Sequence, residues 1–215
     1  MSSNNLNLSD PTKLNQLQHE RSLVLIKPDA VARHLVGEII TRFERKGIKI
    51  AAMKLIWPTD ELALKHYEVT DEWLESSGQR TYNGYVEKGV EPPAEPKELA
   101  RNTHRKLMSA ITAGPVAALV LEGAHVIEVV RKMRGTTSPL AAEVGTIGFD
   151  YSLESYELAD AGDWAIRNII HGSDSHGSAA REIPLWFREE EVVNYETTIT
   201  EMLYNKDWKA KTHEG

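Results

Sequence analysis

The sequence predicts an α+β fold in which helices pack on a four-stranded antiparallel sheet. Short apolar runs that stop at proline or glycine alternate with segments whose apolar residues recur at helical spacing. In chain order the elements are strand, helix, strand, helices, strand, helix, strand and helix. This is the βαββαβ order of a ferredoxin-like sandwich with added helices. The topology alone does not indicate a chemistry.

The first half of the sandwich is predicted from residues 22–69. The run SLVLI is typical of a buried strand, and Pro28 stops it so that Lys27 and Asp29 lie at its tip. Three elements follow: a helix over 35–47 that ends at Gly47, a strand over 48–58, and a helix over 59–69 that starts at a Thr-Asp cap and carries Tyr67.

Residues 71–103 interrupt this alternation. The stretch GVEPPAEPKE holds three prolines and cannot be regular throughout, so we expect a surface insertion with a helix around 71–88. The remaining predicted elements are a helix over 103–112, a strand over 115–123, a helix over 124–135, a long loop with one short helix over 136–162, a strand over 164–172, a helix over 173–187, and a polar tail with one or two short turns over 188–208.

The chain is predicted to form one domain over 21–190. A flexible leader over 1–20 precedes it, a tail over 191–215 follows it, and insertions are expected at about 71–100 and 151–162. A chain of 215 residues, 41% of them hydrophobic, can bury one good core. The polar start has no apolar signal core and no run approaches the roughly 20 apolar residues of a membrane span, so we expect a cytoplasmic protein without a membrane partner.

Charge and cysteine content exclude several function classes. The formal net charge is −7 and no long basic block occurs, which argues against a nucleic-acid partner and leaves room for isolated phosphate sites. The predicted strands also lack the spaced aromatics of an RNA-recognition sheet. The chain has no cysteine, which excludes disulfides, thiolate zinc sites and a cysteine nucleophile.

A histidine at the end of the last predicted strand is the first candidate for catalysis. His171 precedes Gly172 and Ser173, where the backbone can approach a ligand and a helix N-terminus can attract an anion. Glu182 lies eleven residues further on and could reach back to the imidazole, fixing its tautomer and leaving the other ring nitrogen free as a nucleophile. An ordinary half-buried histidine is the alternative interpretation.

Several polar groups suggest that the substrate carries phosphate. Each of them alone is explained as a solvated charge, a core-edge tyrosine, a turn residue or a strand-edge cap, so only their combination is informative. They are Lys27, Tyr67, Arg131, Thr137 and Asn168.

The sequence resembles the nucleoside diphosphate kinase family. The segments that carry the resemblance are SLVLIKPDAVARHLVGEIITRFERKGIKI, HYEV, GPVAALVLEG, RKMRGTTSP, GTIGFD and RNIIHGSDSHGSAAREIPLWF. They cover most of residues 21–190 outside the expected insertions, and KPDAV followed by NIIHGSDS is highly specific. The resemblance implies ping-pong transfer of a γ-phosphoryl group, from a nucleoside triphosphate such as ATP to a nucleoside diphosphate, through a phosphohistidine.

The resemblance also implies a role for individual residues. His171 matches the nucleophile, Glu182 the carboxylate that orients it, and Ser173 the serine that hydrogen-bonds the carboxylate. Lys27 matches the lysine that binds the γ-phosphate and a sugar hydroxyl, and Tyr67 matches the tyrosine that lines the phosphate site. Arg131 and Thr137 match residues that contact phosphate, and Asn168 matches the asparagine that contacts the sugar. Mg²⁺ is expected as the cofactor, held mainly by substrate phosphates rather than by a protein metal site.

Three positions depart from the family pattern. Gly148 in GTIGFD stands where the family has a phosphate-binding arginine, which predicts reduced turnover unless Arg134, Arg101 or Arg105 reaches the phosphate. At the base site the family's phenylalanine and leucine fall on Thr103 and Leu107, and Tyr82 or Tyr85 could supply the missing aromatic ring. Pro184 should bend the last helix and alter the aim of Glu182.

Two hypotheses of different classes follow. The first is an active nucleoside diphosphate kinase, favoured because the nucleophile and its orienting carboxylate are both present. The alternative is a nucleotide-binding scaffold or regulatory homologue with weak turnover. The resemblance further implies a homo-oligomer, a hexamer or a tetramer, with Pro139 in the loop that supports oligomer contacts.

Overall fold

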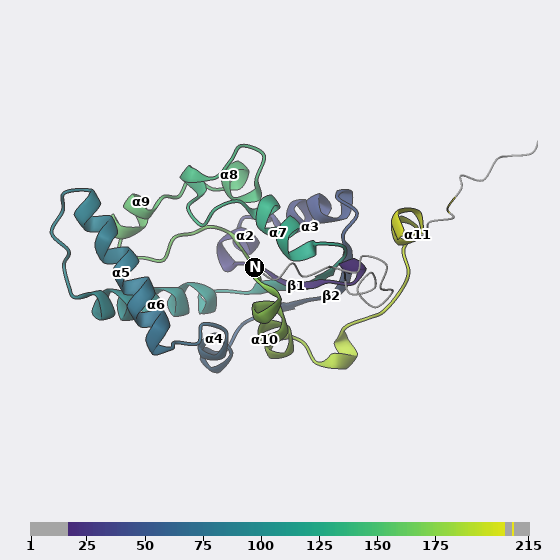
Figure 1. Ribbon diagram of the computed structural model, residues 1–215, viewed down its shortest axis with the longest axis horizontal. Coiled ribbons are helices and arrows are strands. Elements are labelled where there is room, and N and C mark those ends of the chain that lie inside the picture. The colour runs from purple at the N-terminus through teal and green to yellow at the C-terminus, as the bar shows by residue number, and fades with distance from the viewer. Residues whose placement is uncertain (1–16, 205–207, 209–215) are drawn as a thin grey trace, which may run out of the picture.

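The computed structural model describes residues 17–204 and 208 (Figure 1). Its four strands form one sheet in the order β2-β3-β1-β4, with every neighbouring pair antiparallel. The strands are β1 Arg21–Ile26, β2 Lys49–Ile56, β3 Val116–Glu122 and β4 Ile170–Gly172. This topology confirms the predicted ferredoxin-like α+β fold.

Helices cover both faces of the sheet, which explains why β1 and β3 are apolar nearly throughout. On one face Val24 and Ile26 pack with the amphipathic helices α3 (Val36–Arg45) and α7 (Val126–Arg134). On the other face Leu23 and Leu25 pack with α4 (Asp60–His66), α6 (Pro96–Thr112) and α10 (His176–Trp186). Figure 1 shows these two helix layers above and below the strands.

The junctions around the first two strands differ slightly from the expectation. Pro28 does end β1, but the chain turns at once into α2, Pro28–Ala32, because proline at the first helical position has a suitable φ and needs no hydrogen bond there. The side chain of Thr59 caps α4 as expected, whereas Tyr67 follows the last residue of α4 instead of lying inside the helix.

Regular structure occupies much of the region expected as an insertion. The helix predicted around 71–88 is confirmed as α5, Asp71–Glu87, with the Thr70 side chain as its cap. The following helix α6, Pro96–Thr112, begins seven residues before the predicted start. A proline suits the first turn of a helix, so Pro96 starts the helix rather than preventing it. The two helices pack side by side (Figure 1).

A glycine sets the distance between α5 and α6. A Cβ atom at Gly78 would lie 2.0 Å from the Pro96 carbonyl oxygen, whereas one at Gly84 in the same helix would meet nothing within 4 Å. We therefore expect Gly78→Ala to lower the free energy of unfolding by about 1–3 kcal/mol through overpacking. Gly84→Ala should raise it by about 0.5–1 kcal/mol through helix propensity. Urea unfolding of both variants measures the difference, and equal stabilisation by both would contradict this packing.

The region between α7 and α10 departs most from the prediction. The predicted strand over 164–172 is wrong except for its last three residues, because Ile169 has a positive φ of 55° that ends any extended conformation before β4. The expected loop over 136–162 contains three short helices instead of one: η1 Pro139–Ala141, α8 Ile147–Tyr151 and α9 Tyr156–Ala161.

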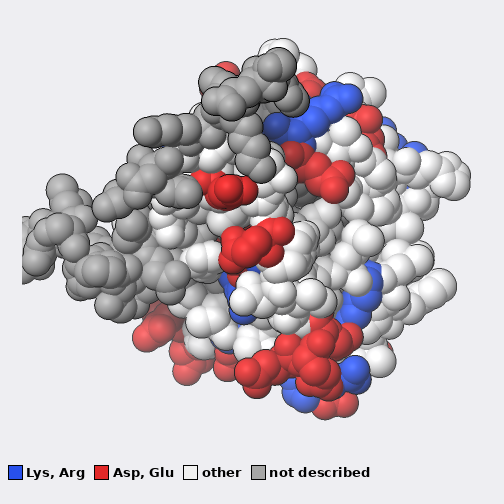
Figure 2. Space-filling view, turned by 90° about the vertical axis from the view of Figure 1, so that its right-hand side faces the viewer, with Lys and Arg blue, Asp and Glu red and all other residues white. Residues whose placement is uncertain are grey.

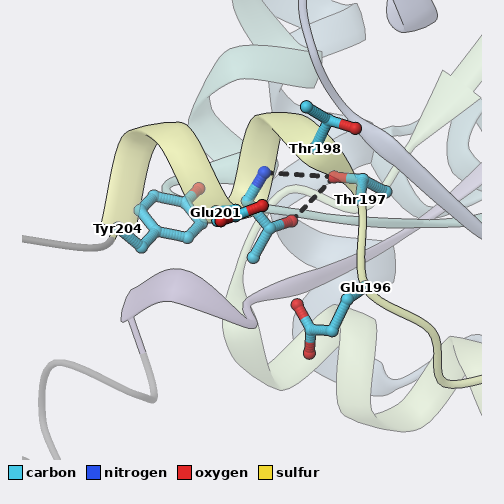
Figure 3. A pocket seen from close by; sticks show the side chains of 6 residues that line it. Glu196, Thr197, Thr198, Glu201 and Tyr204 are labelled. Atoms are coloured by element: carbon cyan, nitrogen blue, oxygen red, sulfur yellow. Dashed lines mark hydrogen bonds between the residues drawn. The ribbon is translucent and has the colours of Figure 1, made fainter. Parts of the chain in front are cut away.

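The C-terminal segment contains the two short turns expected of the tail. They are η2, Glu189–Glu191, and α11, Thr198–Tyr204. Beside α11 lies a shallow cavity in which the Thr197 side chain accepts a hydrogen bond from the Thr200 backbone N–H, and Glu196 and Glu201 are the charged groups of its lining (Figure 3). Two carboxylates without a cation do not suit a phosphate ligand.

Two further observations concern the surface and the ends of the chain. The face seen in Figure 2 carries several acidic patches and smaller, separate basic ones. Within residues 17–204 and 208, no helix combines the length and apolar character that a membrane crossing requires. The predicted flexible leader falls mostly on residues 1–16, which lie outside the described part.

Candidate active site

The strand β4 brings His171 next to Glu182, which lies on the second turn of α10. The His171 Nε2 atom lies 3.2 Å from Glu182 Oε2, and the Ser173 hydroxyl donates to the same oxygen at 2.8 Å. The Ser173 oxygen in turn accepts from the Leu23 backbone N–H at 3.1 Å, so β1 anchors the chain of contacts. Both Ser173 and Glu182 are buried and His171 is half-buried.

These contacts define which ring nitrogen of His171 has a free lone pair. Burial would raise the pKa of Glu182, but the hydrogen bonds and charge supplied by His171 and Ser173 outweigh it and lower that pKa. The carboxylate therefore stays ionised and can only accept hydrogen bonds, so His171 Nε2 carries a proton. In the neutral ring Nδ1 then holds the free lone pair of a nucleophile.

A strained turn positions the residues that precede His171. Ile169 is β-branched and has a φ of 55°, a conformation that costs about 1–3 kcal/mol. Two hydrogen bonds hold it: its N–H donates to Asp29 Oδ2 at 3.1 Å, and its carbonyl accepts from the Lys27 N–H at 2.9 Å. The turn thereby places Asn168 beside the tip of β1.

Lys27 and Asn168 form the second group of the site. The Lys27 ammonium donates to Asn168 Oδ1 at 2.6 Å, and Asn168 Nδ2 donates to the Thr137 carbonyl at 3.1 Å. Burial lowers the pKa of Lys27 to about 8, with Asp29 opposing the shift and Arg134 adding to it. An anionic partner beside this lysine would raise its pKa again by favouring the charged ammonium.

The low pKa of Lys27 predicts an alkaline limit to activity. Below pH 8 the ammonium is charged and can bind phosphate, and its charge is lost as the pH rises through about 8. We therefore expect kcat/KM to fall about tenfold per pH unit above this value. In a Lys27→Arg variant the guanidinium stays charged, so the decline should disappear even if the maximum is lower. The same decline in Lys27→Arg would assign it to another group.

A cavity of mixed charge lies along the end of α7 and shares Thr137 with this group. Its basic side chains are Arg131, Lys132 and Arg134, and its acidic ones are Glu20, Glu128, Glu143 and Asp174. Arg131 donates to the Asp174 carbonyl at 3.1 Å, and the cavity lining includes Arg131, Arg134, Thr137 and Asp174. Gly148 lies buried in α8 next to the end of α7 and contributes no side chain. Of the three arginines considered as replacements, Arg134 lines this cavity, and Arg105 lines a different cavity to which Lys27 also contributes.

His66 is a site residue that the sequence interpretation missed. Its ring packs edge-on against those of His171 and Tyr67, each with 4.7 Å between centroids, and it is 3% exposed. Burial, followed by the charge of His171, lowers the pKa of His66 to about 3, so the ring is neutral. The only sequence signal was its position on the buried face of α4, next to Tyr67.

The group formed by His66, His171 and Glu182 is compact enough to hold a metal ion, but its chemistry does not fit one. Trp186 Nε1–H donates to His66 Nδ1 at 3.3 Å. The proton of the neutral His66 ring must therefore lie on Nε2, which leaves no lone pair facing the group. His66 Nε2 has no hydrogen-bond partner within the described residues.

Other predicted site residues are only partly brought together. Burial raises the pKa of Tyr67, which borders the site through His66, so its hydroxyl stays protonated. Thr103 and Leu107 lie on α6, where the Thr103 hydroxyl bonds its own helix at the Leu99 carbonyl. Neither lines the cavity at Lys27, to which α6 contributes Lys106 and Ser109 among others.

Pro184 does not have the expected effect on Glu182. The helix α10 continues past it to Trp186, and the Glu182 carboxylate still meets His171 and Ser173. The proline lies in the last turn, where it can remove only the hydrogen bond to the Ala180 carbonyl. The predicted change of aim is therefore wrong.

Comparison with known proteins points to one family. The family model described as nucleoside diphosphate kinase matches residues 20–87 and 96–192 and leaves out only residues 88–95 in between. The nucleoside diphosphate kinase of Pyrobaculum aerophilum is 45% identical over 179 residues, covering 81% of this chain and 98% of that protein. The Pyrococcus furiosus protein of the same name is 46% identical over 192 residues, covering 89% and 97%.

Solved structures agree with these relatives. The crystal structure of an NDP kinase from Pyrobaculum aerophilum has a TM-score of 0.79 at 44% identity and covers 82% of this chain and 100% of its own. A transition-state mimic of the nucleoside diphosphate kinase from Borrelia burgdorferi, with bound vanadate and ADP, has a TM-score of 0.70 at 33% identity and covers 86% and 96%.

Proposed function

Since the chain belongs to the nucleoside diphosphate kinase family and is thus a phosphotransferase that acts on nucleotides, we propose that it works through a phosphohistidine at His171. The observation that carries this proposal is the contact of Glu182 with His171 Nε2 at 3.2 Å, which leaves Nδ1 free to attack. A nucleotide-binding scaffold would have no physical need for a buried carboxylate held in this way.

The proposed reaction has two half-reactions at one nitrogen. Nδ1 attacks the γ-phosphorus of a nucleoside triphosphate in line with the leaving oxygen. An N–P bond forms, the bond from phosphorus to the bridging oxygen breaks, and the nucleoside diphosphate leaves as an anion. A second nucleoside diphosphate then attacks the phosphohistidine through its terminal phosphate oxygen and regenerates the imidazole.

The cationic groups of the site suit this transition state. We assign the phosphate contacts to Lys27, Arg131 and Thr137, the sugar contact to Asn168, and a place at the border of the phosphate site to Tyr67. Positive charge spread around a transferring phosphoryl group stabilises its equatorial oxygens. Thr103 and Leu107 are proposed to lie near the base, with a loose grip because neither offers a flat ring.

Mg²⁺ is the proposed cofactor. The one compact His/Glu group among the described residues has no suitable lone pair on His66, and the carboxylates that line the phosphate cavity do not form such a compact group. The ion would therefore be held by phosphate oxygens and water, where it neutralises charge on the nucleotide.

Trapping the intermediate tests this mechanism. The protein is incubated with γ-labelled ATP and Mg²⁺, and the label is expected on the protein in an acid-labile, base-stable form that excess GDP removes rapidly. Bound nucleotide without such label would overturn the phosphohistidine and support a scaffold role.

We also propose a homo-oligomer, either a hexamer or a tetramer. Apolar side chains are exposed along β2, where Met53 and Leu55 are 58% and 66% exposed, and beside the buried Pro139, where Leu140 is 70% exposed. Light scattering of the purified protein would distinguish the two assemblies from a monomer.

The cytoplasmic location expected from the leader stays a prediction.

A further inference from the structure

Three cationic side chains of the candidate site, Lys27, Arg131 and Arg134, lie close enough for neighbouring charges to repel. The charge of Arg134 is one cause of the low pKa of Lys27, after burial, and the charge of Arg131 is one cause of the lowered pKa of Arg134, again after burial. None of these three side chains takes part in an ion pair within residues 17–204 and 208. Three cations that repel one another in this way suit a multiply charged anion.

Arg134 is the member of this group that has no role so far. It is the last residue of α7, it lines the same cavity as Arg131 and Thr137, and its Nε atom is buried without a hydrogen-bond partner in the described part of the chain. The carboxylate whose charge opposes the lowered pKa of Arg134 is that of Asp174, which already accepts a hydrogen bond from Ser178. The cavity lining also includes Glu20, Glu128 and Glu143, and none of them forms an ion pair with Arg134 within the described residues. A buried guanidinium donor without an acceptor suggests a missing ligand.

The packing beneath α7 explains why the charge comes from this helix. A Cβ atom at Gly148 would lie 3.0 Å from the Arg134 carbonyl oxygen and 3.8 Å from that of Thr136. The helix α8 therefore lies directly against the end of α7, and a side chain at position 148 would push on that end. A guanidinium at this place is more easily supplied by α7 than by α8.

We propose that Arg134 binds a phosphate of the nucleotide that is not transferred, and so supplies the positive charge that position 148 lacks. This inference rests on the active site proposed above. The transferred phosphate has to lie against His171 Nδ1, and no hydrogen bond or ion pair of the described residues joins Arg134 to His171 or Glu182. Arg134 is thus a substrate-binding residue of the phosphate chain.

Binding measurements with Arg134→Gln test the proposal. The dissociation constant for ADP should rise about 10- to 150-fold, as for the loss of one charge-assisted phosphate contact, while that for adenosine stays unchanged. KM should rise more than kcat falls. The matched control is Arg45→Gln, which removes an exposed arginine from the last position of α3 and should bind ADP like the wild type.

A pH profile adds a readout that a purely structural role would not move. Without the charge of Arg134, the pKa of Lys27 should rise, since burial and Asp29 then remain as its causes, and the alkaline fall of kcat/KM should shift upward. If Arg134→Gln lowers the melting temperature, Arg134→Lys shows whether the loss of charge or the loss of stability weakens binding. The retained charge of the lysine should restore most of the ADP affinity.

The result that overturns the proposal is wild-type affinity for ADP in Arg134→Gln, or equal losses for ADP and adenosine. Failure of the phosphohistidine mechanism is separate, because it would appear as absent label on the wild type itself.

Discussion

Replacing His171 with alanine is expected to lower kcat by about 10⁴-fold or more while leaving ADP binding nearly intact. The proposed nucleophile is lost, whereas Lys27 and Arg131, the proposed phosphate contacts, keep the partners that position them, Asn168 and the Asp174 carbonyl. The measurement is steady-state transfer from ATP to GDP, together with labelling by γ-labelled ATP, which should fall to background.

A histidine outside the site provides the control for this variant. His34 follows α2, its side chain is exposed, and its positive φ of 58° is one that asparagine tolerates. His34→Asn should label and turn over like the wild type. Labelling that persists in His171→Ala, or disappears in His34→Asn, would contradict the assignment of the nucleophile.

The second large effect is expected from Glu182→Ala. This change leaves the Ser173 hydroxyl and the His171 N–H without an acceptor in a buried place, so the free energy of unfolding should fall by about 2–4 kcal/mol. The imidazole also loses the group that fixes its tautomer, so kcat should fall about 10- to 100-fold. Chemical denaturation and steady-state kinetics measure the two effects.

Glu182→Gln separates orientation from charge. The amide oxygen can still accept from His171 and Ser173, so its kcat should lie between those of the wild type and Glu182→Ala. The lowered pKa of Glu182 means that its charge stabilises the fold at neutral pH and loses this effect as the pH falls below its ordinary value of 4.5. The glutamine variant should lack this acid-dependent loss. Identical kinetics for the alanine and glutamine variants would refute the orienting role.

Much of the fold could be predicted because periodicity and stop signals are local. The helix α3 has its apolar residues on one face and ends before Gly47, and β1 and β3 are continuous apolar runs. The strand β4 could not be delimited, because the positive φ of Ile169 depends on hydrogen bonds to Lys27 and Asp29, which are distant in sequence. Residue types near Ile169 gave no sign of that turn.

The site was predictable in its parts but not in its details. His171, Glu182 and Ser173 do meet, and Lys27 does meet Asn168, whereas their individual nucleotide contacts stay predictions. His66 was missed because only the packing of α4 against α10 turns its ring toward His171. The position of Arg134 likewise depends on how closely α8 lies against α7, which a single sequence does not reveal.

The hydrogen bonds behind His171 all end at the Glu182 carboxylate. The Leu23 N–H donates to the Ser173 oxygen, and the Ser173 hydroxyl donates to Glu182. The Nε2–H of His171 donates to the same carboxylate. Each of these donors already has an acceptor, so none of them is available to Nδ1. In neither half-reaction does Nδ1 need to gain or lose a proton. Turnover through this imidazole therefore carries a phosphoryl group and no proton, and the protein needs no proton-conducting route from the site to bulk water.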